Sequence, residues 1–363
     1  MSVGKKYVVG RQTFATISLS ALQHNFAIMS QCAPNSKTIA VIKADAYGHG
    51  AQQVALALGS QVEVFAVAFM DEALVLREQG IKQPILLLEG VMDAEEMACA
   101  KHHELWVTMH TAEHFTWLRA LHKNIRPTFW VKIDTGMHRL GITLNSAQQV
   151  LSANRDLLQT DTVLCSHLAC ADEIANPLNL QQVSLLNEIA TAFNLNVSMA
   201  NSGGIAHWPD SHASWNRLGI ALYGCAQPMD NNSKLRPVMS LHAPIIALRN
   251  IASGESVGYA QTWTAQRPTV IATVAIGYAD GYPRHAPTGT EAWLNGQLVP
   301  LVGRVSMDML TFDVTDLLEV EVGDSVELWG ENMPVETVAH KAGTISYELL
   351  TRISPRVKRR YIA

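Results

Sequence analysis

The feature that most constrains the fold is a repeated alternation of short apolar runs with longer amphipathic stretches over the first two thirds of the chain. Continuous apolar runs are typical of parallel strands buried on both faces, and the amphipathic stretches between them predict connecting helices. The strand-like runs are 38–43, 64–68, 85–89, 105–109, 129–134, 162–168, 197–201 and 215–220. The clearest expected helices are 70–79, 111–121, 146–153 and 178–193. Eight repeats predict an α/β fold, a closed (β/α)8 TIM-like barrel, with an open doubly wound sheet as the alternative.

The pattern changes after Gly224. Residues 226–237, AQPMDNNSKLRP, are polar and end in proline, which predicts a linker. Beyond it, alternating strands with glycine turns predict a mostly β C-terminal domain, with a single helix at 344–353. We therefore expect an N-terminal segment 1–12, a barrel 13–228 and a β-rich domain 229–363. The alternating run 14–19 either joins the barrel edge or pairs with the second domain.

Composition excludes several function classes. Of the 363 residues 48% are apolar and 16% charged, which is typical of a globular protein with a substantial core. The net charge is −5 and no basic stretch is interleaved with aromatic residues, so nucleic acid is not an expected partner. The basic run 356–360 alternates like a solvated edge strand. No stretch reaches the ~20 apolar residues of a membrane span, and we expect a soluble cytoplasmic protein.

Cysteine usage argues against disulfides and metals. The five cysteines are odd in number and scattered, which does not suggest a disulfide framework. Only CSHLAC, from Cys165 to Cys170, has a spacing that suggests zinc. Because no second cluster completes a tetrahedral site, no metal is expected.

Chemistry-bearing residues follow the expected strands at their carboxyl ends, where barrels of this type hold their active sites. The first run ends at Lys43, and Tyr47 and His49 follow. Later runs contribute Lys132, Asp134 with the nearby Arg139, His167, the turn ANSGG and Arg217. Each residue alone has a structural interpretation: a surface lysine, an Arg139–Asp134 pair, a core histidine, a glycine turn. Their shared position at one face predicts a functional site.

A lysine leaving a buried strand is costly as a bare cation, so it must be neutral, paired or covalently occupied. The Ser-Gly-Gly turn at 202–204 is followed by an expected helix start, which favours an anion such as phosphate. Phosphate together with an isolated lysine suggests pyridoxal 5'-phosphate, whose aldehyde forms a Schiff base with a lysine amine.

Eight motifs in this chain resemble, in the same order, those of the alanine racemase family, which comprises fold-type III pyridoxal phosphate enzymes. They are VIKADAYGHG, VKIDTGMHRLG, SHLACAD, ANSGG, RLGIALYG, GYADGYP, GRVSMD and ISYE. The resemblance covers nearly the whole chain. It implies a PLP-dependent racemase that interconverts L-alanine and D-alanine by proton exchange at Cα.

The resemblance also implies roles for individual residues. Lys43 resembles the lysine that carries the cofactor and moves the proton on one face of the substrate, and Tyr259 resembles the acid–base group on the opposite face. His167 would link Tyr259 to Arg217, which resembles the residue facing the pyridine nitrogen. Further cofactor contacts implied by position are Tyr47, Ser202, Gly219, Ile220 and Tyr347.

Other residues resemble the family's substrate-binding groups. Arg139 matches a residue near the substrate carboxylate, and an arginine fork suits that group. Lys132 matches a lysine that is carbamylated in many members. In the family, Tyr259, Tyr278 and Met307 reach the active site of the neighbouring subunit, so the resemblance implies a head-to-tail homodimer with shared sites. Met307 would offer its N–H to the substrate carboxylate.

At some positions the sequence differs from the residues that are common in the family. Asp45 stands where asparagine is frequent, Leu218 where proline is common, and Ser306 where many members have cysteine.

Three alternative functions stay open. They are a fold-type III amino acid decarboxylase, a single-barrel pyridoxal phosphate carrier and a racemase of broader specificity. The decarboxylase is expected to carry a cysteine motif in its second domain, and this chain has no cysteine after Cys225. The carrier would leave the second domain unexplained.

Overall fold

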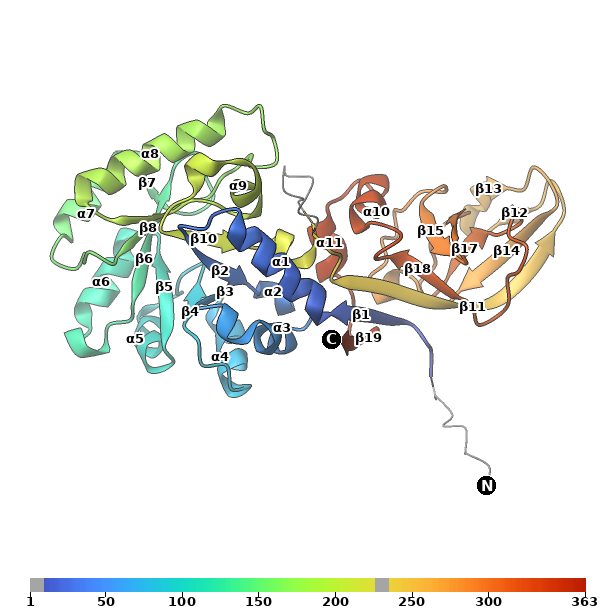
Figure 1. Ribbon diagram of the computed structural model, residues 1–363, viewed down its shortest axis with the longest axis horizontal. Coiled ribbons are helices and arrows are strands. Elements are labelled where there is room, and N and C mark those ends of the chain that lie inside the picture. Colours follow the sequence, from blue (N-terminus) through green and yellow to red (C-terminus); the bar gives the residue numbers. More distant parts are fainter. Residues whose placement is uncertain (1–9, 226–234) are drawn as a thin grey trace, which may run out of the picture. The chain divides into compact units, whose positions relative to one another are not determined.

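The protein consists of two compact units, labelled by element in Figure 1. The structure is a computed structural model that describes residues 10–225 and 235–363. One unit, residues 19–236, contains a parallel barrel, and the other joins residues 1–18 to residues 237–363. The division therefore falls at different residues from the expected 13–228 and 229–363, and most of the expected linker, residues 226–234, lies outside the described residues.

The barrel unit has eight parallel strands in a ring. In order around the sheet they are β10 (Trp215–Leu218), β2 (Lys37–Val41), β3 (Phe65–Val67), β4 (Ile85–Leu87), β5 (Leu105–Met109), β6 (Phe129–Asp134), β8 (Val163–Cys165) and β9 (Asn196–Ser198). A short β7 (Ile142–Thr143) pairs with β6 outside the ring. The Arg217 N–H donates to the Ala200 carbonyl at 2.9 Å, which connects β10 to the end of β9. The predicted (β/α)8 barrel is confirmed, and the open sheet is excluded.

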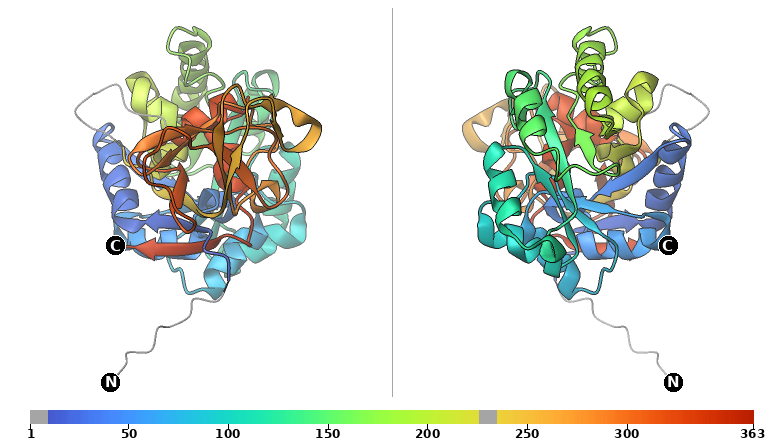
Figure 2. Two further views of the ribbon diagram at one scale, coloured as in Figure 1. Left: turned by 90° about the vertical axis from the view of Figure 1, so that its right-hand side faces the viewer. Right: turned by 90° about the vertical axis from the view of Figure 1, so that its left-hand side faces the viewer.

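Helices surround the strands, as the right-hand view of Figure 2 shows. They are α1 (Leu19–Gln31), α2 (Lys43–Tyr47), α3 (Ala51–Leu58), α4 (Met70–Glu78), α5 (Ala94–His102), α6 (Ala112–Ala120), α7 (Leu144–Ala153), α8 (Leu178–Phe193) and α9 (Ser202–His207), with the 3-10 turns η1 (Gly59–Gln61), η2 (Lys123–Ile125), η3 (Pro209–Ser211) and η4 (Ile220–Tyr223). Local sequence sets where they begin. The Asp93 side chain accepts the Glu96 N–H at 2.8 Å and the Thr111 hydroxyl accepts the His114 N–H at 3.4 Å, which caps α5 and α6.

The second unit is built on an eight-stranded sheet whose main path is β16 (Gln297–Pro300), β15 (Glu291–Leu294), β18 (Ser325–Trp329), β11 (Met239–Ile251), β1 (Phe14–Ser18) and β19 (Lys358–Ile362). β14 (Thr269–Val274) also pairs with β11 and carries β17 (Leu310–Asp313). A small ribbon joins β12 (Ser256–Val257) to β13 (Trp263–Thr264). The turns η5 (Tyr259–Gln261) and η6 (Tyr278–Asp280) lie between strands. The predicted β-rich second domain is confirmed.

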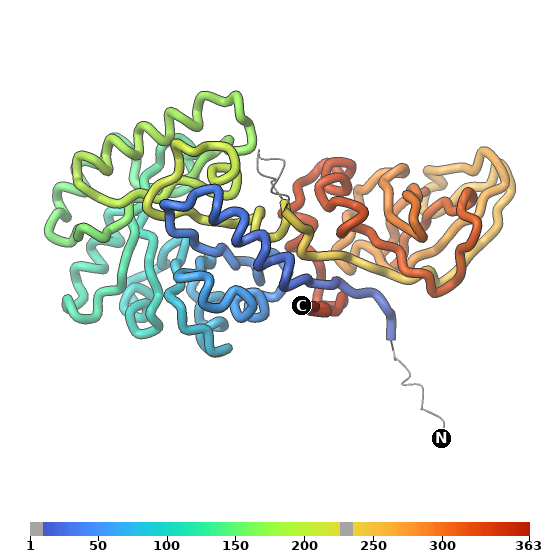
Figure 3. Tube along the Cα trace, viewed as in Figure 1, coloured from blue at the N-terminus to red at the C-terminus, as the bar shows by residue number. Residues whose placement is uncertain are grey.

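The run near the N-terminus belongs to this second sheet. β1 pairs antiparallel with β11 and parallel with β19, and Figure 3 shows the blue, yellow and red traces side by side. This settles the alternative left open for residues 14–19. β19 is the edge strand expected from the basic run 356–360, but Arg356 lies before it and pairs with acidic groups described below.

Two helices replace the single one expected late in the chain: α10 (Val335–Lys341) and α11 (Ser346–Thr351). The first was missed although Val335, Val338 and Ala339 recur at helical spacing and are buried. Within the described residues, no helix has the length and apolar character needed to cross a membrane. In the same residues, no three His, Cys, Asp or Glu side chains are grouped to bind a metal ion.

Candidate active site

A left-handed turn brings Lys43 out of the barrel. β2 ends at Val41, and Ala44, Asp45, Ala46 and Tyr47 in α2 have φ angles of 53°, 52°, 54° and 52°. This conformation costs an L-residue about 1–2 kcal/mol, so the surroundings must hold it. The Glu72 carboxylate, which also caps α4, accepts the Ala44 N–H at 2.6 Å, and the Asp45 carboxylate accepts the Ala51 N–H at 2.8 Å. The sequence placed Lys43 at the strand end but did not predict this turn.

Lys43 is paired rather than isolated. Its side chain is 33% exposed, and Nζ lies 3.3 Å from Oε1 of Glu89. Glu89 follows β4 by two residues, and its carbonyl oxygen contacts Nε2 of His110 at 3.1 Å. Sequence reasoning missed Glu89 as a site residue. Its position directly after a barrel strand was the available signal.

Arg217 is buried on β10 and held in a fixed orientation. Nη1 donates to the carbonyl oxygen of Ser198 at 2.9 Å and to its hydroxyl at 2.6 Å. Nη2 donates to the carbonyl oxygens of Ser166 and, at 3.2 Å, Met199. Burial lowers the pKa of Arg217, but a guanidinium keeps its proton in proteins. The barrel mouth therefore contains a rigid, permanent cation.

His167 lies beside this cation and is neutral. Nη2 of Arg217 is 3.4 Å from its Nδ1. Burial, and then the charges of Arg217 and Lys132, hold the pKa of His167 well below its usual range. Nδ2 of Asn201 lies 3.4 Å from its Nε2, so a donor faces each ring nitrogen, and a neutral imidazole can accept at only one of them. His167 thus lies between the Arg217 guanidinium and the Asn201 amide.

A cradle for a small anion lies next to the left-handed turn. The Ser202 hydroxyl, at the start of α9, accepts the N–H groups of Gly219 at 3.0 Å and Ala221 at 3.1 Å. A Cβ on Gly219 would lie 2.9 Å from the Tyr47 hydroxyl, so glycine lets this hydroxyl approach the backbone closely. Burial raises the pKa of Tyr47 to about 12, which keeps it a neutral hydroxyl that can donate to an anion.

The two glycines after Ser202 have a different role from the expected one. A Cβ on Gly203 would lie 2.8 Å from the Asp172 carboxylate, and one on Gly204 would lie 2.9 Å from the Ala200 side chain. These glycines allow α9 to pack against the barrel, instead of allowing a ligand to approach the backbone. Asn201 caps the helix, because its side chain accepts the Gly204 N–H at 2.9 Å.

Lys132 and Arg139 add positive charge at the same end of the barrel. Burial lowers the pKa of Lys132, which lies on β6 opposite Cys165. Arg139, on the loop after β6, lines a cavity of about 770 Å³ together with Lys43, Glu89 and His110. The expected Arg139–Asp134 pair is not what holds Asp134. That carboxylate accepts the N–H groups of Gly136 and His138 and contacts the His138 ring, each at 3.0 Å.

The remaining predicted site residues lie in the second unit, where they are exposed. The exposed fractions are 67% for Tyr259 on η5, 39% for Tyr278 on η6, 53% for Met307 and 40% for Tyr347 on α11. The predicted site residues thus form two groups. The barrel unit brings together Lys43, Tyr47, Lys132, Arg139, His167, Ser202, Arg217, Gly219 and Ile220, while the second unit carries the other four.

A closed parallel barrel with a paired lysine after its first strand, a fixed arginine and an anion cradle defines a lysine-centred barrel enzyme. Comparison with known proteins gives the family. The alanine racemase N-terminal domain matches residues 17–227, and the alanine racemase C-terminal domain matches residues 238–361. This chain belongs to the alanine racemase family.

Individual relatives agree over nearly the full length. The alanine racemase of Alteromonas mediterranea is 47% identical over 353 residues, which are 97% of this chain and 99% of that protein. The biosynthetic alanine racemase of Pseudomonas aeruginosa has a crystal structure with TM-score 0.91 and 43% identity, covering 98% of this chain and 100% of that one. The Bartonella henselae alanine racemase structure has covalently bound pyridoxal phosphate, with TM-score 0.88 and 32% identity, covering 96% and 99%.

Proposed function

We propose that this protein interconverts L-alanine and D-alanine with pyridoxal 5'-phosphate as cofactor, by proton exchange at Cα between Lys43 and Tyr259. The observation that carries the proposal is the meeting of the Tyr47 hydroxyl, the Ser202 hydroxyl and the Gly219 backbone in the same barrel mouth as Lys43 and Arg217. Two hydroxyls beside a glycine backbone suit a phosphate, and Lys43 is the amine to which the cofactor would attach. Gly219, Ile220 and Tyr347 would complete the phosphate contacts.

The bound cofactor supplies the electron sink that makes the α-proton of the amino acid acidic. The protein moves that proton: Lys43 would take or return it on one face of Cα and Tyr259 on the other. Arg217, held by four acceptors, would face the pyridine nitrogen as a fixed cation that cannot give up its proton.

His167 is the group through which Arg217 would act on Tyr259. A tyrosine hydroxyl has a usual pKa near 10 and is a poor base at neutral pH. An imidazole that donates an N–H to this oxygen, and whose other nitrogen contacts Arg217 at 3.4 Å, would stabilise the tyrosinate. This arrangement requires the tautomer with the hydrogen on Nε2, and it would let Tyr259 act as a base at neutral pH.

Arg139 would bind the substrate, with the Met307 N–H and Tyr278 as further contacts.

Lys132 is a candidate for carbamylation, because burial lowers its pKa and the neutral amine is the form that reacts with carbon dioxide. A carbamate would replace a cation with an anion next to Arg139 and hold the guanidinium in place.

We also propose a head-to-tail homodimer in which the partner subunit's second unit completes each site. The exposure of Tyr259, Tyr278 and Met307 supports this arrangement, because large side chains that act in a reaction need a surface that covers them. In the dimer, each barrel mouth would receive these side chains from the other copy. We propose that the dimer works in the cytoplasm.

The experiment that tests the proposed function follows the α-proton. The purified, cofactor-loaded protein is incubated with L-alanine in deuterium oxide, and NMR and chiral chromatography follow Cα deuteration and D-alanine. We expect D-alanine carrying solvent deuterium at Cα. A yellow, cofactor-loaded protein that forms no D-alanine would refute the proposal, and parallel incubations with L-serine and L-lysine would reveal a broader racemase or, through amine release, a decarboxylase.

A further inference from the structure

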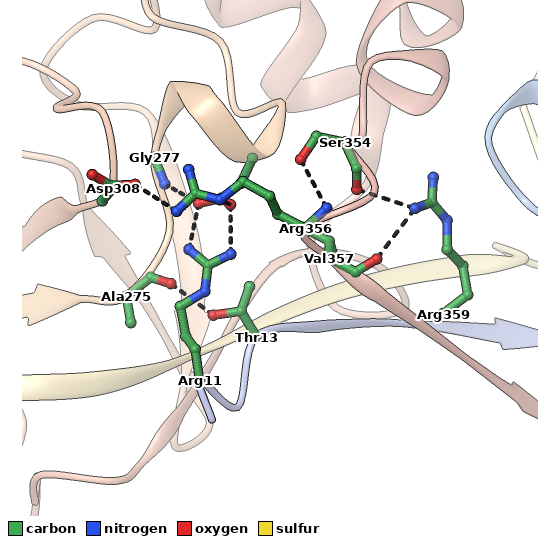
Figure 4. A network of polar contacts seen from close by, with 10 residues as sticks. Arg11, Thr13, Ala275, Gly277, Asp308, Ser354, Arg356, Val357 and Arg359 are labelled. Carbon is green, nitrogen blue, oxygen red and sulfur yellow. Dashed lines mark hydrogen bonds and ion pairs between the residues drawn. The ribbon is translucent and has the colours of Figure 1, made fainter. Parts of the chain in front are cut away.

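A buried carboxylate in the second unit connects distant parts of the chain. Asp280, at the end of η6, has no exposed surface. Its oxygens accept two hydrogen bonds from Arg11, at 2.7 and 2.5 Å, and one from the Gly277 N–H at 3.0 Å. Nε of Arg356 lies 3.4 Å from the same carboxylate. Figure 4 shows the guanidinium groups of Arg11 and Arg356, which come from different segments, beside each other.

The carboxylate lies under the two segments that carry Tyr278 and Met307. The Tyr278 N–H donates to the Ser306 carbonyl at 3.1 Å, and the Ala279 N–H donates to the Met307 carbonyl at 3.0 Å. Arg356 contacts both segments, because its Nη2 also donates to Asp308 at 2.6 Å (Figure 4). Asp280 and its arginines therefore hold together the loop 277–280 and the loop 306–309.

These two loops are also in direct backbone contact. A Cβ on Gly277 would lie 2.3 Å from the Ser306 carbonyl oxygen and 2.4 Å from the Met307 carbonyl carbon. Residue 277 must therefore be glycine for the backbones of the two loops to approach this closely. Together with the two backbone hydrogen bonds, this close approach joins the loops.

The attraction within a buried ion pair is largely offset by the cost of removing its charges from water, so the network is weak evidence for net stability, although removal of one partner leaves a buried charge uncompensated. Tyr278 and Met307 are exposed, so core packing does not position them. Their backbone hydrogen bonds, with the Asp280 network behind them, are what sets where they project.

We propose that Asp280, held by Arg11 and Arg356, is a positioning residue that fixes Tyr278 and Met307 for substrate binding. The inference rests on the proposed function for the roles of the Tyr278 side chain and the Met307 N–H. The hydrogen bonds and ion pairs of this network, as described above, involve no residue of η5, the turn that carries Tyr259. Loss of the network should therefore weaken substrate binding more than proton transfer.

The first test uses Arg11→Lys, which keeps the charge but removes the bidentate fork, and Arg356→Gln, which breaks the two contacts made from the 46% exposed Arg356 side chain. We expect the KM for alanine to rise about tenfold in each, the equivalent of one well-placed hydrogen bond, with kcat changed less than about threefold. Arg267→Gln is the matched control, because it breaks an exposed ion pair with Asp316 in the same unit. It should change neither constant.

A second readout is independent of activity. Amide hydrogen exchange should be faster at residues 278–279 and 306 in both variants, and unchanged in Arg267→Gln. Should Arg11→Lys fail to fold, Arg356→Gln alone decides. Faster exchange with an unchanged KM would overturn the positioning role, as would unchanged exchange. A wild-type protein without racemase activity would instead refute the proposed function, and the exchange result would still report on the network.

Discussion

Tyr259 can be replaced without disturbing the fold, because its side chain is exposed, so its proposed catalytic role can be tested directly. Its side chain is 67% exposed, so Tyr259→Phe should change the free energy of unfolding by no more than about 0.5 kcal/mol. If Tyr259 serves the face of the L-enantiomer's proton, the variant should lose deuterium exchange from L-alanine far more than from D-alanine. NMR of each enantiomer in deuterium oxide measures both rates. Equal losses would contradict a one-sided base.

His114 is a buried histidine that should make the free energy of unfolding depend on pH. It is 2% exposed, Nδ1 accepts the His110 N–H at 3.1 Å, and Nε2 contacts the Val91 carbonyl at 3.1 Å. Burial, with the neighbouring His110, lowers the pKa of His114 from its usual 6.5 to about 4. The unfolded chain therefore binds more protons between these values, and stability that is complete above pH 6.5 is lost as the pH falls toward 4.

The predicted size of this loss in the free energy of unfolding is about 2 kcal/mol between pH 7 and pH 5. In His114→Gln the side chain cannot take up a proton, so the drop in the urea unfolding midpoint between these two pH values should be smaller than in the wild type. His102→Gln removes an exposed histidine at the end of α5 and is the control. A His114→Gln protein that retains the full pH dependence would show that other groups cause it.

The element with the most consequence for function is the left-handed turn of α2. Its φ angles are tolerated best by glycine, asparagine and aspartate, and Asp45 is the one residue of that type among Ala44–Tyr47. The Asp45 carboxylate also accepts the Ala51 N–H at 2.8 Å, which ties the turn to the start of α3. Asparagine at this position would have the same two properties.

We therefore expect Asp45→Asn to leave stability and cofactor binding nearly unchanged. Asp45→Val should cost about 2 kcal/mol, because a β-branched residue is strained at positive φ and the hydrogen bond is lost. Since Lys43 and Tyr47 flank the strained residue, Asp45→Val should also bind pyridoxal phosphate more weakly. Thermal unfolding and titration of the apoprotein with the cofactor measure the two effects. If valine were tolerated as well as asparagine, the turn would not depend on residue 45.

Elements were predictable from the sequence where one local signal decides them. Eight barrel strands follow from continuous apolar runs, and α8 follows from its amphipathic period. The left-handed turn was not predictable in this way, because the bonds that hold it come from Glu72 on α4 and from the start of α3. Likewise, the Lys43–Glu89 pair joins residues 46 apart, and only closure of the barrel brings them together.

At the scale of the whole molecule, the sequence indicated two domains but not which segments form each one. β1 is separated from β11 by the entire barrel unit, and their pairing depends on long-range register that no local pattern encodes. The same holds for Asp280, whose partner Arg11 is 269 residues away. Motif resemblance located individual site residues without showing these connections.

If active sites are shared between subunits, the racemase activity of mixed dimers depends on which subunit carries each substitution. This can be measured on heterodimers purified through two different affinity tags. A heterodimer of a Lys43→Ala subunit with a Tyr259→Phe subunit should have about half the wild-type activity, although each homodimer is inactive. One of its two sites then combines an intact Lys43 with an intact Tyr259 from the other copy. A heterodimer of wild type with the double variant is the matched control, and every site in it would carry one lesion. If each subunit used its own Tyr259, the two results would be reversed. The control heterodimer would then have about half the wild-type activity, because its wild-type subunit would contain a complete site, and the heterodimer of the two single variants would be inactive, because neither subunit would contain one.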